Sequence, residues 1–414
     1  MMRRYAAVAT AVALGLVATG CRAPKKVLTE QDKQSVKDSV LTEAPSGETI
    51  VPLNANLDDK VMLVSYSANK HNVKPGDSVA VTLYWKSLAK VTDDYKIFVH
   101  LDASKARKTY DHYAINGLYP TANWKVGEVL KDEFTIQVDQ GFPPGPARLW
   151  VGMFDAAAWR DRKENKRLSV KDAGNCRTDK ESRLLVTSFL VGDVPDKVLK
   201  VRKATGPVAV DGKLDEADWK QALLDMGTFT THEGKPVPPA EAVEGGLLYD
   251  DKNLYVAFKV KDTDLVSPYK DRDSTLWSAG KGSGDVVEFY FDPDGDGKKY
   301  LELQVSPAGV VFDAVFDSYR NPAWKKAAEA NLAVEQKVTV DGTLGDQKAD
   351  AGYTVEIAIP WTELPGMTGV PAPTQRFKAN LIRLSNSGTW AANWSPAGND
   401  FHDLTLAGTV TFGN

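Results

Sequence analysis

Three aspartates alternate with small residues in the stretch Asp292-Pro293-Asp294-Gly295-Asp296-Gly297. Carboxylates that converge on a tight turn suit calcium, a hard cation that takes oxygen ligands. Leu303 stands where an EF-hand loop would have its closing glutamate, and the flanking residues are typical of strands. We therefore expect calcium at Asp292, Asp294 and Asp296, with a plain glycine-rich hairpin turn as the alternative.

Two segments on either side of this turn alternate apolar residues with polar or aromatic ones. Val287 and Phe289 would share one face of a strand, which leaves Glu288 and Tyr290 on the other. The second segment places Gln304 on such a face in the same way. Sugars bind to this mixture, because flat aromatic rings pack on their CH-rich faces and fixed polar groups meet their hydroxyls. A solvated outer face of a sheet has the same pattern.

Three tryptophans, Trp277, Trp390 and Trp394, lie in loop-like polar sequence. They are better candidates for a binding surface than Trp219 and Trp361, which lie in apolar patterns. The alternative for each is a loop anchor that packs over the core.

No catalytic constellation stands out, so we expect no enzyme. A glycosidase needs two carboxylates across a cleft, and no such pair is distinguished among the acidic residues. The glycine-rich run 280–284 lacks the spacing of a P-loop. Cys176 has no histidine or second cysteine nearby, which favours an inert thiol.

The composition is that of a globular protein with two or three domains. The chain has 414 residues, of which 26% are charged and 43% hydrophobic. A net charge of −4 disfavours nucleic acid as a partner. Two cysteines are too few for a disulfide framework, and no second long apolar run follows the N-terminus.

Residues 1–21 predict a secretory signal that ends at a lipidated cysteine. Arg3 and Arg4 precede an apolar stretch over residues 6–18. Cys21 follows small residues and resembles the cysteine of a bacterial lipobox, which implies cleavage before it and acylation, as with palmitate. Arg22 replaces the aspartate that retains lipoproteins at the inner membrane, so we expect a lipid anchor in the outer membrane. An ordinary secreted protein is the alternative.

The remaining chain predicts an all-β protein with two β-sandwich domains. Residues 22–57 are polar and charged, and we interpret them as a tether with a weak helix around Gln31–Leu41. Short strands between glycine and proline turns follow over 58–192, which is typical of a sandwich. A boundary near Gly192 precedes a second set of strands over 196–414.

The first set resembles an immunoglobulin-like domain of bacterial envelope proteins. The motifs that carry this resemblance are Pro75-Gly76-Asp77, Leu83-Tyr84-Trp85, Phe98-Val99-His100-Leu101, Pro120-Thr121-Ala122-Asn123-Trp124 and Gly152-Met153-Phe154-Asp155. It implies no catalytic role.

The second set resembles family 9 carbohydrate-binding modules. The motifs, in the order of that family, are residues 210–216 with Trp219, 251–258, 285–292, 300–305, Pro360-Trp361, and Trp394-Ser395-Pro396 with His402. The resemblance implies a sandwich that binds a sugar, often between two tryptophan rings, and that holds calcium. The site residues it implies are Trp277, Glu288, Gln304, Arg383, Trp390, Asn393 and Trp394. A surface salt bridge between Glu288 and Arg383, without a ligand, is the alternative. A flexible insert over 278–284 departs from the family and separates Trp277 from Asp285.

We therefore expect a non-catalytic envelope lipoprotein that binds carbohydrate through its C-terminal domain. One alternative is an envelope scaffold that binds a protein partner with the same sandwiches. Another is a haem-binding sandwich, for which His232, His402, Met226 and Met367 could supply axial ligands, although the haem-attachment motif Cys-x-x-Cys-His is missing.

Overall fold

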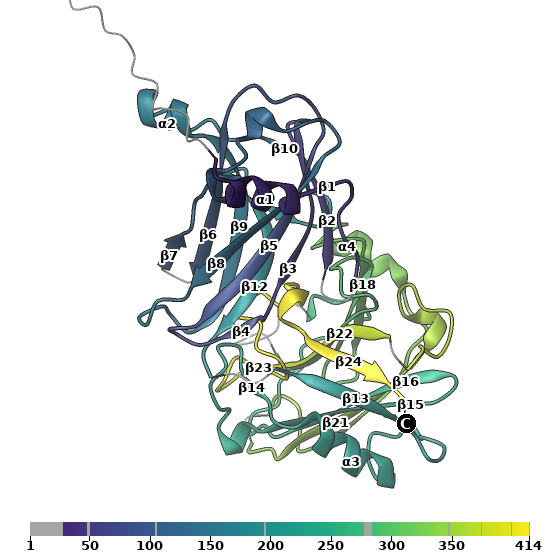
Figure 1. Ribbon diagram of the computed structural model, residues 1–414. Helices are drawn as coiled ribbons and strands as arrows, with labels where there is room; N and C mark the ends of the chain where they lie inside the picture. Colours follow the sequence, from purple (N-terminus) through teal and green to yellow (C-terminus); the bar gives the residue numbers. More distant parts are fainter. Residues whose placement is uncertain are drawn as a thin grey trace, which may run out of the picture.

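The computed structural model describes residues 28–47, 50–103, 106–193, 196–276, 284–346, 348–373, 375–398 and 400–413. Two of the predicted functional residues, Cys21 and Trp277, lie outside these ranges. The prediction of an all-β fold is confirmed: an N-terminal β-sheet domain is followed by a C-terminal domain with one curled sheet (Figure 1). Within the described ranges, no helix is long and apolar enough to cross a membrane.

The N-terminal domain consists of two sheets that share one apolar core. The strand order of the first sheet is β1 (Val40–Leu41), β8 (Val129–Gln137), β5 (Ser78–Ser87), β3 (Val61–Ala68), β2 (Val51–Leu57) and β10 (Val170–Asp172). That of the second is β11 (Arg177–Thr178), β12 (Leu184–Val191), β9 (Gly145–Asp155), β6 (Tyr95–Ala103) and β7 (Ala106–Thr109), with β4 (Asn72–Val73) paired to β12. Alternate residues such as Leu83, Trp85, Val99 and Val151 are fully buried in the core.

The predicted tether over residues 22–57 is wrong from Glu30 onward, although the helix expected around residues 31–41 is present. The helix α1 (Glu30–Ser39) begins with a capping box at Thr29 and leads into β1, which pairs with β8. Strand β2 then pairs with β3. Strand β2 is seven residues long, and every second residue from Leu53 to Leu57 is buried. Because this alternation is short and lies in polar sequence, it does not stand out as a strand.

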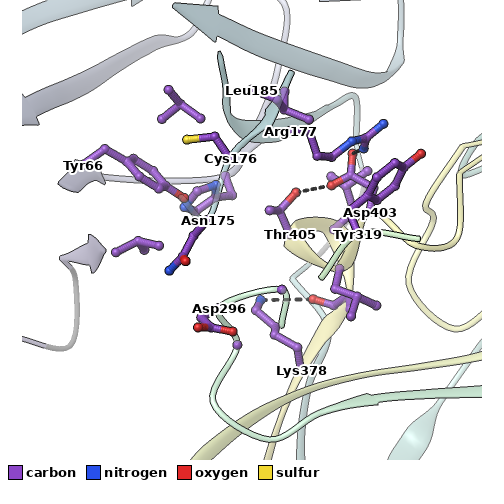
Figure 2. Close-up of a pocket in the computed structure, with 18 of the residues that line it drawn as sticks. Tyr66, Asn175, Cys176, Arg177, Leu185, Asp296, Tyr319, Lys378, Asp403 and Thr405 are labelled. Carbon is purple, nitrogen blue, oxygen red and sulfur yellow. Dashed lines mark hydrogen bonds and ion pairs between the residues drawn. The ribbon is translucent and has the colours of Figure 1, made fainter. Parts of the chain in front are cut away.

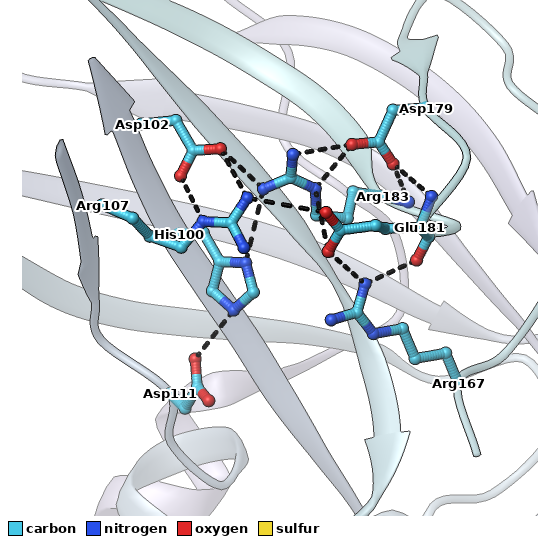
Figure 3. A network of polar contacts seen from close by, with 8 residues as sticks. All are labelled: His100, Asp102, Arg107, Asp111, Arg167, Asp179, Glu181 and Arg183. Atoms are coloured by element: carbon cyan, nitrogen blue, oxygen red, sulfur yellow. Dashed lines mark hydrogen bonds and ion pairs between the residues drawn. The ribbon is translucent and has the colours of Figure 1, made fainter. Parts of the chain in front are cut away.

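The outer face of the second sheet carries a network of charged side chains (Figure 3). Arg107 donates two hydrogen bonds to Asp102, at 2.8 and 3.0 Å, and Arg183 bridges Asp102 and Asp179. The Arg183 guanidinium also lies 4.7 Å from the centre of the Trp150 ring. These groups satisfy one another within the N-terminal domain.

The C-terminal domain is a twelve-stranded sheet that folds back on itself. Its main path is β19 (Val311–Phe316), β18 (Tyr300–Val305), β17 (Val286–Asp292), β22 (Arg376–Leu384), β24 (Gly408–Phe412), β13 (Val198–Lys203), β15 (Val243–Tyr249), β16 (Asn253–Val260), β21 (Gly352–Pro360) and β20 (Glu335–Asp341). Strand β23 (Ala391–Asn393) pairs with β22 and with β14 (Thr230–Thr231). The sheet turns at β13, which pairs with β24 through its first residues and with β15 through Arg202 and Lys203.

The two halves of this sheet enclose one apolar core. Phe289 and Phe291 of β17 lie in the same buried cluster as Val256 and Phe258 of β16. Besides α1, the described residues form α2 (Ala156–Arg162) in the N-terminal domain, and α3 (Ala217–Met226) and α4 (Trp324–Ala327) in the C-terminal domain. On α3, Trp219 packs inward as predicted, and its indole nitrogen donates to Glu356 at 2.8 Å.

A buried ion pair connects the two sheets of the N-terminal domain. His112, which bridges to Ile97 of the second sheet, places Nε2 2.8 Å from Oδ2 of Asp132 on β8 of the first sheet. Asp132 is fully buried and also accepts from the backbone of Ile115. Burial opposes protonation of the imidazole, but the hydrogen bond and charge of Asp132 outweigh it and raise the pKa of His112.

We predict that Asp132→Asn lowers the free energy of unfolding by about 2 kcal/mol at pH 6, because it removes a charge-assisted hydrogen bond. A histidine whose folded pKa is raised stabilises the fold fully below its unfolded pKa, and this contribution is lost as the pH rises through the folded pKa. The deficit of the variant should therefore shrink by pH 9 in chemical unfolding measurements. Asp139→Asn is the control: it removes only an exposed ion pair with Lys108 and should change the free energy of unfolding by less than about 0.5 kcal/mol.

Candidate functional site

A row of polar side chains crosses the outer face of the C-terminal sheet. Gln304 on β18 stands opposite Glu288 on β17, which stands opposite Ile382 on β22. Ile382 in turn stands opposite Asn393 on β23, and Asn393 opposite Thr230 on β14. Directly paired residues of antiparallel strands share a face. The sheet therefore brings Gln304, Glu288, Asn393 and Thr230, here called the polar row, onto one face.

Every member of the polar row has a buried polar atom without a hydrogen-bond partner. These atoms are Gln304 Oε1, Glu288 Oε2, Thr230 Oγ1 and both the Oδ1 and Nδ2 atoms of Asn393. A buried polar group left unpaired costs about 1–3 kcal/mol. Native proteins keep such groups where water or a ligand completes their bonding. The polar row is thus suited to a ligand that offers several hydroxyls.

A buried carboxyl pair lies at one end of the polar row. Gln304 Nε2 donates to Oε1 of Glu288 at 2.9 Å and to Oε1 of Glu302 at 2.7 Å, and Tyr290 donates to Glu302 at 2.8 Å. Burial raises the pKa of Glu302 to about 7 and raises the pKa of Glu288 well above its usual range, with the charge of Glu302 as the next cause. Because the pair retains a proton near neutral pH, it can both donate to and accept from hydroxyl groups.

Aromatic rings lie on the same outer face. Trp390 is half-buried, stacks on Phe401 at 5.7 Å between ring centres, and meets His232 edge-on at 5.2 Å. It belongs to the apolar cluster that covers this face, with Val286, Tyr290 and Ile382 at its centre. The predicted residues Glu288, Gln304, Asn393 and Trp390 are therefore on one side of the sheet.

Two predicted site residues, Arg383 and Trp394, face the opposite way. Arg383 stands opposite the core residue Val287, is fully buried, and forms an ion pair with Asp262 rather than with Glu288. Trp394 is 1% exposed, lies in the apolar core, and donates from its indole nitrogen to the carbonyl of Met226 at 2.8 Å. The prediction of Trp394 as a binding ring is wrong, because strand β23 continues its alternation past Asn393 and turns the next side chain inward.

We predict that Trp394→Ala lowers the free energy of unfolding by about 3–5 kcal/mol, because it leaves a large cavity in the core. Trp390→Ala should cost much less, since that ring is half-buried. Chemical unfolding of the two variants and the parent protein compares these effects. Equal losses for both variants would contradict the inward placement of Trp394.

The three predicted metal ligands lie together at the turn between β17 and β18. One carboxylate oxygen of each of Asp292, Asp294 and Asp296 lies within 4.8 Å of the others. Asp292 is fully buried and accepts backbone hydrogen bonds from Gly295 and Gly297, each at 2.9 Å. Burial, and then the charges of Asp294 and Asp296, raise the pKa of Asp292 to about 7. An acidic set of this kind fits a hard divalent cation, which would neutralise the repulsion among the carboxylates.

We predict that calcium binding weakens about tenfold between pH 8 and pH 6, because the ion must displace the proton that Asp292 holds below its raised pKa. Calorimetric titration at both values measures the change.

Chelator should lower the melting temperature of the parent protein but not that of Asp294→Ala. If the parent protein melts at the same temperature with and without chelator, the turn holds no structural calcium.

Sequence reasoning missed Thr230, because β14 is a two-residue strand without a periodic pattern. It also gave no sign of a cavity of about 750 Å³ that lies between the two domains (Figure 2). Tyr66, Asn175 and Cys176 of the N-terminal domain line this cavity, together with Asp296 and Lys378 of the C-terminal domain. Burial raises the pKa of the Cys176 thiol to about 12, which agrees with an inert thiol.

Comparison with known proteins relates the C-terminal domain to carbohydrate-binding domains. Residues 210–413 match the family model described as Carbohydrate family 9 binding domain-like. Exoglucanase XynX from Acetivibrio thermocellus is 25% identical over 236 residues, which make up 55% of this chain and 18% of that enzyme. The chain thus spans less than a fifth of the length of this relative.

Two solved structures are similar to about half of the chain. A Bacteroides uniformis protein that is proposed to bind carbohydrate is 16% identical, with a TM-score of 0.41 over 53% of this chain and 100% of that one. A family 9 carbohydrate-binding module from Caldicellulosiruptor kristjanssonii in complex with cellotriose is 18% identical, with a TM-score of 0.36 over 53% of this chain and 94% of that one.

Proposed function

We propose that this protein, in which residues 210–413 form a carbohydrate family 9 binding domain-like domain, is a non-catalytic envelope lipoprotein whose polar row binds carbohydrate. The observation that carries the proposal is the set of buried, unpartnered polar atoms that Gln304, Glu288, Asn393 and Thr230 direct to one face. A sugar offers several hydroxyls at fixed spacing, and each hydroxyl both donates and accepts.

The surroundings of the polar row support a sugar over a purely apolar or purely charged ligand. The carboxyl pair of Glu288 and Glu302 supplies a donor as well as acceptors, and Trp390 supplies an aromatic ring at the same face. The family 9 module from Caldicellulosiruptor kristjanssonii has solved structures in complex with cellotriose and with glucose. We therefore choose glucose-based oligosaccharides as the first probes for this protein.

The envelope part of the proposal rests on the sequence of residues 1–21. Acylation of Cys21 would anchor the chain in the membrane, with the outer membrane as the expected location. Because α1 begins at Glu30, only a short segment separates Cys21 from the N-terminal domain. At about 3.5 Å per residue, that segment holds the domain within roughly 30 Å of the bilayer. A calcium ion at Asp292, Asp294 and Asp296 would stabilise the turn beside the sugar-binding strands.

We predict that the full-length chain without its signal binds cellotriose or another glycan on an array in the presence of calcium. Gln304→Ala and Asn393→Ala should each lower the affinity about tenfold, because each removes hydrogen bonds to the ligand. Gln336→Ala is the matched control: it also has an unpartnered side-chain oxygen, but it lies on β20, away from the polar row.

Circular dichroism and thermal melting show whether each variant is folded. If the folded parent protein binds no glycan, carbohydrate binding is overturned, and the alternative of a scaffold for a protein partner is tested by pull-down from an envelope extract.

A further inference from the structure

An ion-pair cluster joins the two domains. Arg177 on β11 places Nη2 2.9 Å from Oδ2 of Asp400, and Arg148 on β9 places Nε 3.4 Å from Oδ2 of Asp403. Each arginine also lies within 4 Å of the other aspartate. Ser188 of β12 donates to Asp403 at 2.8 Å. The N-terminal domain therefore supplies two cations and a hydroxyl. The C-terminal domain supplies the carboxylates and a third cation, Arg320, whose Nη2 lies 3.5 Å from Oδ1 of Asp400.

This cluster is largely removed from solvent. The Asp403 side chain is 2% exposed and that of Asp400 14%. The Arg177 guanidinium lies 3.6 Å from the centre of the Tyr319 ring (Figure 2). The Tyr319 hydroxyl donates to Asp400 at 3.1 Å. Buried carboxylates that lose their cations repel each other and are strongly destabilised. Residues 400–407 are here called the interface loop. Arg148 and Arg177 thus hold the interface loop in position.

The interface loop leads directly to the polar row. His402 lies between the two aspartates in sequence, and its Nδ1 is 2.7 Å from the Tyr300 hydroxyl. The Tyr300 oxygen already accepts from the backbone of Arg320, so its own proton is available for His402. This arrangement places the imidazole proton on Nε2, which is 3.6 Å from Oε2 of Glu302. Glu302 is bonded to Gln304, the first member of the polar row.

A second contact between the domains reaches the other end of the polar row. Gly398 has a φ of +63°, and a Cβ atom there would lie 2.8 Å from Pro146 of β9. The same glycine donates from its backbone to the carbonyl of His232 at 2.9 Å. His232 contacts Trp390 and lies two residues from Thr230. The N-terminal domain therefore supports the binding face at both ends.

We infer that the N-terminal domain is a part of the carbohydrate site, and that Arg148 and Arg177 are positioning residues that fix His402 and, through Glu302 and Gln304, the geometry of the polar row. The inference rests on the proposed function of the polar row. It assigns the first domain a role beyond that of a spacer between membrane and sugar.

The test measures cellotriose binding by the full-length chain without its signal. Arg148→Ala combined with Arg177→Ala should lower the affinity about 3- to 30-fold, the range for residues that act on a site through others. Arg148→Lys combined with Arg177→Lys retains the charges and should recover most of the binding. Arg107→Ala is the matched control, because this arginine is on the same sheet but bonds within the N-terminal domain (Figure 3).

A second readout does not depend on the sugar. The chain has five histidines, so the imidazole nitrogen shifts of His402 can be assigned by NMR. In the double alanine variant these shifts should report the loss of the bond to Tyr300, while in Arg107→Ala they should match the parent protein. Circular dichroism confirms that both domains remain folded.

The outcomes separate the two proposals. A parent protein that binds cellotriose, together with a folded double alanine variant of unchanged affinity, overturns the positioning role and leaves carbohydrate binding intact. A parent protein that binds no glycan overturns carbohydrate binding. In that case unchanged His402 shifts in the double variant also overturn the positioning role, whereas altered shifts support the link from the interface to Glu302.

Discussion

Strands β17, β18 and β22 are buried on both faces, and the rest of the C-terminal domain depends on this constraint. Nearly every residue of these strands is inaccessible to solvent. The inner face meets this condition with apolar side chains such as Phe289 and Leu381. The outer face carries carboxyl, amide and hydroxyl groups, which must find partners because water cannot reach them freely. The hydrogen bonds from Gln304 to Glu288 and Glu302 satisfy some of these polar groups within the protein.

The chemistry of this outer face follows from its low exposure. Burial opposes ionisation of Glu302 and Glu288, and the negative charge of Glu302 further disfavours ionisation of Glu288. A proton shared by such a pair provides a donor where two carboxylates would provide acceptors only. Partners for the polar row must therefore donate as well as accept, which suits hydroxyl groups. In the neighbouring turn, a bound cation would offset the charges of Asp292, Asp294 and Asp296 as a proton does for the carboxyl pair.

The relation between the domains rests on charges that neither domain satisfies alone. Burial works against ionisation of Asp400, but Arg177, Arg320 and Arg148 outweigh it and lower its pKa. Two of these arginines belong to the N-terminal domain. Burial lowers the pKa of His402 to about 3, so the imidazole between the two aspartates is neutral and acts through hydrogen bonds. The interface therefore fixes a loop whose neutral histidine touches the binding face.

The sequence by itself determined the all-β class and the residues that alternate on β17 and β18. These features depend on local periodicity, which a strand expresses wherever it folds. Glu288, Gln304 and Asn393 were found in this way and through the family motifs, and the acidic turn was evident from its spacing. Only the tertiary structure decided that Arg383 and Trp394 point inward, that Thr230 completes the polar row, and that residues 30–57 belong to the first domain. These three features depend on pairing between segments that are distant in the sequence. Such pairing determines which face of the sheet a side chain lies on and which group a charge contacts, and neighbouring residues do not encode it.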